Sequence, residues 1–438
     1  MDMYLNKMKY MLKGPSWLRL YTMLSMVILL MCGCIAEPEI SLNEEMIALA
    51  PMDSVVLSAE TMGVTETLQW SSSDTAVATV EDGKVTAHSP GEARITVSAG
   101  DVSAACQVKV SRLEFTLEGT VVEAYNDYAL MLNELSRETV LSVEYNGIDV
   151  MGSYDPAKCI VTLDRNKMIA PERDALEGSL SVQTNRASYT IPVTLVTMEI
   201  DTEEELYKLP SVINEFKGMG YYRLSNDIVC YGTYPESTYL AAEGFNGTFD
   251  GCGFAIYNFQ TDQVKPKSVN RGFIGRVLGS EGIVKNISFV NAKHTGYGGF
   301  ITTYAYGTFE NVYVQIGVEP LVNPNSSTAA YATSVLTAET AHNTRFNHVV
   351  VEYVNPLPDN SKVGYAVHVM HRGYGYNGLY VIGATSINGT EGVNKKNPAD
   401  ICGAYMTCSD MRKANLDYNS WDETFWSIID GIPYPSLG

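Results

Sequence analysis

The chain lacks the residue patterns that usually hold a metal ion or a cofactor. It has six histidines and eight cysteines among 438 residues, and no two cysteines stand in a CxxC spacing. Zinc sites in proteins are usually built from close Cys or His pairs. His368 and His371 are three residues apart, which on a strand places them on opposite faces, so we predict no metal and no cofactor. The sequence allows a disulfide bridge between Cys230 and Cys252, or between Cys402 and Cys408, in an oxidising compartment.

Local catalytic patterns are also missing. Between Tyr221 and Cys408, where the repeats lie, no closely spaced pair of acids, no DxD cluster and no Ser–His–Asp order stands out. Enzymes that cleave polysaccharides need two carboxylates flanking the bond, or a base beside calcium-binding acids. Such groups can come from separate parts of a fold without forming a local motif. The sequence therefore favours a non-catalytic protein, with a lyase or hydrolase as the alternative.

Positive charge is scarce. The chain has 30 Lys and Arg side chains against 50 Asp and Glu, a formal net charge of −20 at pH 7. So acidic a chain repels polyanions, and we expect no nucleic-acid partner. One basic run is a local exception: Lys265, Lys267, Arg271, Arg276, Lys285 and Lys293. This run would attract an acidic sugar; the alternative interpretation is a solvated surface.

Long apolar runs are absent after the N-terminus. Four basic side chains precede an apolar run at residues 24–31, which is typical of a secretory signal peptide. The run ends in Cys32-Gly33-Cys34, and a small residue directly before a cysteine resembles the lipobox of bacterial lipoproteins. The resemblance implies that residues 1–33 are removed and that Cys34 carries lipid. The alternative is an ordinary signal peptide with Cys34 incidental.

Lipid on Cys34 would tether the protein to a membrane, with a linker at residues 34–38. The next residue is Ile35 and not Asp, which in lipoproteins favours export to the outer membrane. We therefore expect a protein of the cell envelope, lipid-anchored at the outer membrane and exposed on the surface.

Residues 39–111 alternate polar and apolar side chains around an Asp82-Gly83 turn, a pattern typical of β-hairpins. They resemble the group 2 bacterial immunoglobulin-like domain of invasin-type surface proteins. The elements that carry this resemblance are Trp70-Ser71-Ser72-Ser73-Asp74, Val77-Ala78-Thr79-Val80, Asp82-Gly83, Val85-Thr86-Ala87, Gly91–Val97 and Cys106–Val110. The resemblance implies an Ig-like β-sandwich that acts as a spacer or an adhesive module and has no catalytic residues.

Residues 112–200 contain further short runs with strand composition, separated by turns such as Asn146-Gly147. We predict a second β-sandwich here. Its expected strands are Leu113–Val121, Val140–Tyr145, Cys159–Leu163, Leu180–Thr184 and Tyr189–Val196.

Residues 201–438 contain a repeat. A run of the form apolar-x-Asn-apolar-x-apolar starts at Val284, Phe309, Phe346 and Tyr376, in steps of 25, 37 and 30 residues, with Asn replaced by His348 and Gly378 in the later copies. Repeats of this length are too small to bury their own apolar face, and strand-rich copies pair in parallel. Together with Gly-Phe-Ile runs, they resemble the GLUG-type and pectate-lyase-like proteins. The resemblance implies a right-handed parallel β-helix, so we predict an all-β protein.

Both ends of this repeat have candidate caps. Thr202 and Glu205 form a capping box, which predicts a helix from Glu203 to Phe216 whose apolar side covers the first coil. At the other end, we predict an aromatic lid over the last coil. Its residues are Trp421, Phe425, Trp426, Ile428 and Ile429.

Tyrosine is concentrated in the repeat region, which holds 20 of the 28 tyrosines. Alignment of the repeats places Ser288, Tyr313, Val350 and Tyr380 in one column that points away from the core. Exposed aromatic side chains suit sugar rings or a protein partner, although tyrosines also stack simply to stabilise such columns. The candidate ligand contacts are Tyr313 and Tyr380, with Tyr304, Tyr306 and Tyr374 at nearby turns.

These observations favour a non-catalytic surface lipoprotein that presents a β-helix on Ig-like spacers. Its expected activity is adhesion or carbohydrate binding, and its expected partners are the membrane, a glycan or a protein of a host or cell surface. A polysaccharide lyase or glycoside hydrolase acting along the β-helix groove is the alternative, and a purely structural surface protein is a third possibility.

Overall fold

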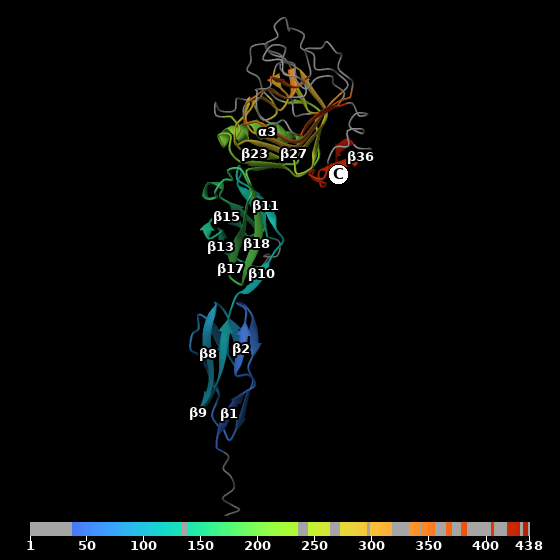
Figure 1. Cartoon of the computed structure of the whole chain (residues 1–438). Helices are drawn as coiled ribbons and strands as arrows, with labels where there is room; N and C mark the ends of the chain where they lie inside the picture. The colour runs from blue at the N-terminus through green and yellow to red at the C-terminus, as the bar shows by residue number, and fades with distance from the viewer. Residues whose placement is uncertain are drawn as a thin grey trace, which may run out of the picture. The chain divides into compact units, whose positions relative to one another are not determined.

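The structure is a computed structural model of the whole chain (Figure 1). It describes residues 37–132, 138–234, 244–262, 272–295, 298–317, 333–341, 343–354, 365–369, 378–382, 404–406, 418–429 and 432–436. The predicted signal peptide, Cys34 and Tyr374 lie outside these residues. The described parts are mostly β-strand, as predicted, and within them no helix is long and apolar enough to cross a membrane.

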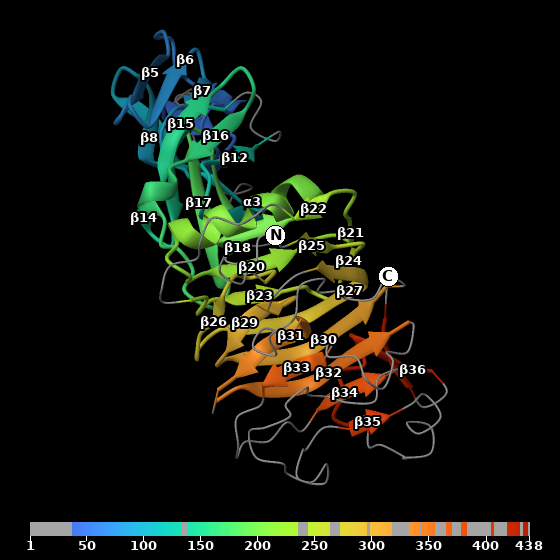
Figure 2. The ribbon, with the colours of Figure 1, turned by 90° about the horizontal axis from the view of Figure 1, so that it is seen from above.

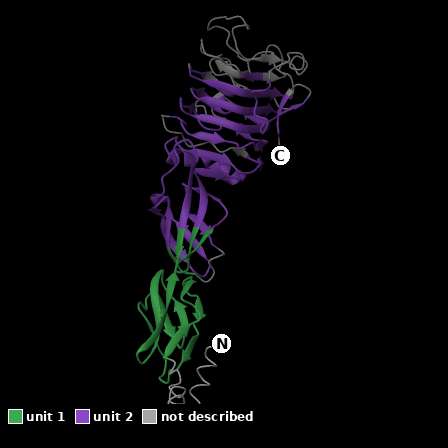
Figure 3. Ribbon diagram, turned by 60° about the horizontal axis from the view of Figure 1, so that its bottom comes forward, with its two compact units in different colours: residues 1–115, 137–141, 182–189 green, residues 116–136, 142–181, 190–438 purple. Residues whose placement is uncertain are grey.

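The chain divides into two compact units, shown in different colours in Figure 3. The first comprises residues 1–115, 137–141 and 182–189, and the second comprises residues 116–136, 142–181 and 190–438.

The first unit contains an Ig-like fold of nine short strands. Their sheets run in the orders β2-β9-β8-β5, β3-β7-β6 and β1-β4. The Asp82-Gly83 turn between β6 and β7 takes positive φ angles of 46° and 81°, which tight hairpins require. The core includes Val85, Ile95 and Cys106. The strands are β1 (Glu39–Leu42), β2 (Met46–Leu49), β3 (Ser54–Val56), β4 (Ala59–Met62), β5 (Gln69–Ser72), β6 (Ala78–Glu81), β7 (Lys84–Ala87), β8 (Gly91–Ala99) and β9 (Val102–Val110).

Residues 113–196 form two further sheets. Six strands pair in the order β10-β18-β17-β13-β14 with β11 beside β18, and three pair as β12-β16-β15. Two sheets are what the predicted sandwich needs, and Val143, Val161 and Leu180 are fully buried. The strands are β10 (Leu113–Thr116), β11 (Thr120–Glu123), β12 (Tyr128–Met131), β13 (Val140–Tyr145), β14 (Ile148–Asp149), β15 (Met151–Asp155), β16 (Ile160–Leu163), β17 (Leu176–Thr184) and β18 (Ala187–Val196).

The predicted helix is present as α3 (Glu203–Glu215). Thr202 is its N-cap and accepts a hydrogen bond from the amide of Glu205, while the Glu205 carboxylate accepts from the amide of Asp201. Leu206, Leu209, Val212 and Ile213 are buried on its apolar side, as predicted, and join the core of the parallel sheets that follow.

Those sheets pair in parallel throughout. The larger sheet has the strand order β19-β20-β23-β27-β30-β32-β34-β35, with β21, β22, β24 and β25 beside it (Figure 2). The smaller sheet has the order β26-β29-β31-β28, with β33 beside β31. Their bounds are β19 (Met198–Ile200), β20 (Tyr221–Leu224), β21 (Ile228–Val229), β22 (Thr233–Tyr234), β23 (Thr248–Asp250), β24 (Ala255–Tyr257), β25 (Gln260–Asp262), β26 (Val277–Leu278), β27 (Ile283–Thr295), β28 (Gly298–Gly299), β29 (Thr302–Ala305), β30 (Thr308–Ile316), β31 (Thr333–Thr340), β32 (Arg345–Tyr353), β33 (Tyr365–Val369), β34 (Leu379–Ile382) and β35 (Ala404–Met406).

Like residues stack on one another across these strands. Ile287 pairs with Val312, then Val349 and Leu379, and all four are fully buried. The outward column pairs Ser288, Tyr313, Val350 and Tyr380, as the repeat alignment predicts.

The repeated Asn marks a bend within each strand. Asn286, Asn311 and His348 take positive φ angles of 50°, 50° and 54°, and Gly378 takes 100°. Asn tolerates this left-handed conformation better than other non-glycine residues, and glycine adopts it freely. The replacement of Asn by Gly378 therefore preserves the bend.

Candidate binding surface

The predicted tyrosine column lies beneath the end of the chain. Residues 418–429 and 432–436, here called the C-terminal strap, include the hairpin β36 (Trp426–Ile429) and β37 (Ile432–Pro435). Trp421, Phe425 and Trp426 of the strap are buried against Tyr313 and Val350 of the sheet. Partly buried side chains around them are Val290, Tyr380, Tyr418 and Tyr434.

Two predictions are corrected here. Tyr313 points away from the main core as expected, but it is only 3% exposed because the strap covers it, so it is not a surface contact. The aromatic residues of the strap lie against the outward side of β27, β30, β32 and β34, and so do not form a lid over the last coil. Of the predicted lid residues, Ile428 and Ile429 remain 40% and 56% exposed.

The hydroxyl of Tyr313 is also engaged. It donates a hydrogen bond to the carboxylate of Glu352, which also accepts from the amide of Gln315 at 3.2 Å. Burial, and then the neighbouring negative charge of Glu352, raise the pKa of Tyr313 well above its ordinary value. This phenol therefore stays protonated and serves packing between β30 and β32.

A chain of side-chain hydrogen bonds connects the strap to the bend. Asn286 Nδ2 donates to Asp250 Oδ1 at 3.1 Å, Asn311 Nδ2 donates to Asn286 Oδ1 at 3.0 Å, and Trp426 Nε1 donates to Asn311 Oδ1 at 3.1 Å. Lys285 Nζ lies 3.2 Å from the other Asp250 oxygen. This chain of hydrogen bonds, here called the asparagine ladder, thus begins at the Asp250 carboxylate, which only accepts, and ends at the Trp426 indole, which only donates.

Two of the predicted contact tyrosines lie at β29 of the smaller parallel sheet, Tyr304 within the strand and Tyr306 directly after its end. Tyr304 and Tyr306 stand on either side of Ala305, which is fully buried, so alternation points both rings outward. Tyr306 is 42% exposed and Tyr304 is half-buried. Of the remaining candidates, Tyr380 is half-buried with its ring centroid 5.3 Å from that of Trp421. The structure therefore separates the predicted cluster.

Arg276 is a residue that the predicted site did not include. Its guanidinium carbon lies 5.5 Å from the centroid of the Tyr304 ring, and its carbonyl oxygen accepts from the amides of Thr303 and Tyr304. The signal was present in the sequence, because the Gly-Phe-Ile run at 272–274 pairs with that at 299–301 through the amides of Phe273 and Ile274. That offset places Arg276 beside Thr303.

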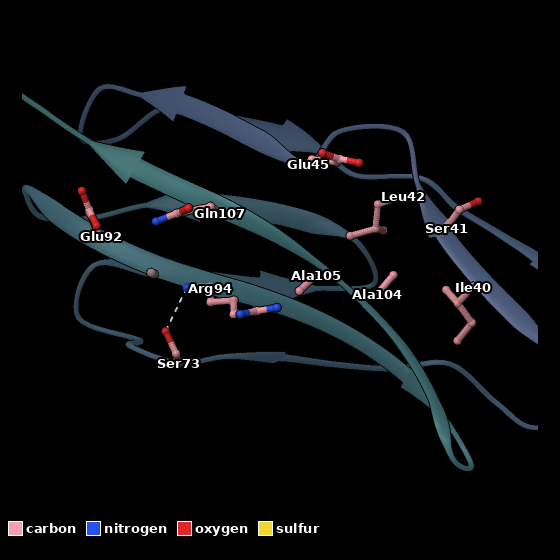
Figure 4. A pocket seen from close by; sticks show the side chains of 11 residues that line it. Ile40, Ser41, Leu42, Glu45, Ser73, Glu92, Arg94, Ala104, Ala105 and Gln107 are labelled. Carbon is pink, nitrogen blue, oxygen red and sulfur yellow. Dashed lines mark hydrogen bonds between the residues drawn. The ribbon is translucent and has the colours of Figure 1, made fainter.

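Two hollows are found among the described residues. One, of about 650 Å³, lies on the Ig-like fold and is lined by Ser73, Arg94, Ala105 and Gln107 among others (Figure 4). The other, of about 490 Å³, is lined by Glu123, Glu177, Glu199 and Arg223 among others. Neither contains a predicted site residue.

The second hollow contains a carboxylate of altered acidity. The pKa of Glu123 is raised to about 7, mainly by burial and in part by nearby acids including Glu205, while the amide of Glu199, which donates to Oε1 at 2.7 Å, opposes the rise. The Glu199 carboxylate is held by Arg223 at 2.5 Å. Glu123 is therefore the described carboxylate best suited to holding a proton near neutral pH.

This shift predicts a pH-dependent stability. The pKa of Glu123 in the folded protein lies above its ordinary value, so the folded state binds this proton more tightly than the unfolded state does. The contribution of the protonated Glu123 to the free energy of unfolding is therefore fully present below about pH 4.5 and is lost as the pH rises through about 7. Glu123→Gln cannot ionise and keeps an oxygen for the Glu199 amide. We expect it to raise the free energy of unfolding by about 1 kcal/mol near pH 8, allowing for solvent screening, with no gain near pH 4. Urea unfolding at both pH values measures this; a gain of equal size at both would contradict it.

The described residues also bear on the predicted metal and disulfide sites. Among the described residues, no group of three or more His, Cys, Asp or Glu side chains could hold a metal ion. Cys230 and Cys252 are free thiols, so the bridge between them is not formed, whereas Cys402 and Cys408 lie outside the described residues.

Comparison with known proteins supports one part of the chain. Residues 38–110 match the family of bacterial Ig-like domains (group 2), which confirms the Ig-like prediction for that segment. No match was found among curated proteins.

Similar solved structures cover about a third of the chain. The I9–I11 tandem from titin is 10% identical over 37% of this chain and 71% of its own, with a TM-score of 0.18. Domains 5–6 of the S-layer protein SbsC are 14% identical over 36% and 95%, with a TM-score of 0.16. An endo-fucoidan hydrolase of glycoside hydrolase family 107 is 14% identical over 37% and 29%, also at 0.16. TM-scores this low support no argument about function.

Proposed function

We propose that this protein is a lipid-anchored surface protein that binds glycans without cleaving them. Residues 1–33 would be its signal peptide, Cys34 its lipidation site and residues 34–38 its linker, which fits an outer-membrane protein facing outward. The Ig-like domain at 39–111 and a second sandwich at 112–200 would be the spacers. The group 2 bacterial Ig-like match at 38–110 supports this surface role.

Residues 201–438 would form a right-handed parallel β-helix, with α3 as its N-terminal cap. The uninterrupted parallel register from β19 to β35 supports this interpretation, because stacked coils pair each strand with its equivalent in the next coil. The shared core of α3 and the first strands supports the cap, since a terminal coil otherwise exposes apolar surface.

The observation that best supports glycan binding is that Tyr304 and Tyr306 both point outward. They leave aromatic surface on the sheet, whereas the column that includes Tyr313 is covered. An exposed aromatic ring offers a flat apolar face with a polar hydroxyl, which suits the C–H face and hydroxyls of a sugar. Because the backbone of both residues is fixed by parallel pairing to Arg276 and Leu278, the pair is preorganised.

A glycan array probed with the chain from residue 34 onward, carrying Cys34→Ser, tests this proposal. We expect binding to at least one glycan class, and Tyr306→Ala should weaken it by about tenfold or more because the exposed ring is lost. Tyr231→Ala is the matched control, since Tyr231 is 89% exposed and lies elsewhere on the same unit. No binding to any glycan would contradict the proposal. Cleavage of a bound polysaccharide would instead support the lyase or hydrolase alternative.

A further inference from the structure

Arg276 presents a positive charge on the same face as the exposed tyrosine pair. Its side chain is exposed, and its guanidinium lies over the Tyr304 ring at 5.5 Å. This distance is within the range of a cation–π interaction, which holds the guanidinium in place and limits the freedom it would lose on binding. The backbone is fixed as well, because the Arg276 carbonyl accepts from the amides of Thr303 and Tyr304 at 3.1 and 2.9 Å.

The charge on Arg276 is not neutralised within the described residues, where no carboxylate lies within ion-pair distance of it. The guanidinium therefore keeps its positive charge in a protein whose net charge is −20. It offers a planar donor fork that matches a carboxylate or a sulfate.

The two tyrosines have different roles in this arrangement. Tyr304 has one ring face occupied by the guanidinium, so it positions the charge. Tyr306 is 42% exposed and, two residues further along the same strand direction, provides an open ring. A ligand that has both a flat apolar face and a negative group can use both features at once.

We propose that Arg276, Tyr304 and Tyr306 form a subsite for an anionic sugar. The carboxylate or sulfate ester of the sugar pairs with the Arg276 guanidinium, while its C–H face lies on the Tyr306 ring. This inference rests on the proposed glycan binding and adds the chemical class of the ligand.

Titration of the same chain with three polymers tests it: polygalacturonate, dextran sulfate and neutral dextran. We expect the anionic polymers to bind and Arg276→Ala to weaken that binding by about tenfold or more, with a smaller loss in Arg276→Lys, which keeps the charge but not the fork. Preference for polygalacturonate identifies a carboxylate ligand, and preference for dextran sulfate identifies a sulfate. Binding should also weaken between about 50 and 300 mM NaCl, because salt screens the ion pair.

Matched variants separate this subsite from general charge effects. Arg345→Ala removes an exposed positive charge from β32, on the larger sheet, and should leave the affinity unchanged. Glu339→Gln removes a formal negative charge at the register position beside Tyr304 and should strengthen anion binding. An equal loss in Arg276→Ala and Arg345→Ala would overturn the subsite. So would binding of neutral glycans only, an outcome that leaves the proposed function intact; absence of all glycan binding would instead defeat the proposed function.

Discussion

Phe289→Ala should lower the free energy of unfolding of the parallel-sheet region by about 3–5 kcal/mol. Phe289 is fully buried, and its ring centroid lies 5.1 Å from those of Phe273 and Phe300 and 5.9 Å from that of Phe259. Three neighbouring rings lose an edge-to-face or tilted partner at once. Because all three rings are themselves buried in a packed core, they cannot close fully around the space that the missing ring leaves.

Chemical unfolding followed by far-UV circular dichroism measures this loss. Phe254→Ala is the control, because Phe254 packs against the same core but is only partly buried. We expect a smaller loss for Phe254→Ala. Equal losses in the two variants would show that the aromatic cluster does not carry the stability assigned to it.

Trp426→Ala should have an effect of similar size, about 3–5 kcal/mol, through a different set of contacts. The indole is 3% exposed and packs against Trp421 and Phe425 with centroid distances of 4.9 and 4.8 Å. Its Nε1 also donates to Asn311, so its removal leaves that buried amide oxygen without its donor. Both losses act on the junction between the strap and β30.

Trp426→Phe separates packing from hydrogen bonding. It keeps most of the apolar area but lacks the indole donor, so we expect a loss of about 1–3 kcal/mol. Ile429→Ala is the control on the same hairpin, since Ile429 is 56% exposed and should change stability little. Hydrogen exchange of the β30 amides should rise with both Trp426 variants. Unchanged exchange would mean that the strap does not stabilise β30.

The repeats could be predicted from the sequence because their signal is local and recurs. The apolar-x-Asn-apolar run fixes which side chains point inward and where the strand bends, and Ile287 and Val312 are register partners as expected. Helix α3 could also be predicted from a local signal, because the capping box of Thr202 and Glu205 lies within the four residues at its start.

The strap could not be predicted in the same way. Trp426 and Asn311 are 115 residues apart, and no periodicity relates them. Alternation correctly predicted that Tyr313 leaves the main core, but it cannot say whether a distant segment covers the ring. The Arg276–Tyr304 contact lies between these cases, because it follows from the offset between two Gly-Phe-Ile runs once their parallel pairing is known.

The direction of the asparagine ladder constrains how this protein can change in length. Asn286 donates its N–H to Asp250 and Asn311 donates to Asn286, each on the preceding strand of the sheet, while the Asn311 oxygen accepts from Trp426 of the strap. A further strand that carries Asn at the bend, placed between Asp250 and Trp426, would meet a donor on one side and an acceptor on the other. Loss of Asp250 would instead leave the Asn286 N–H without its acceptor, and loss of Trp426 would leave the Asn311 oxygen without its donor. The sheet could thus gain or lose whole repeats while the hydrogen-bond chain keeps the same two terminal residues.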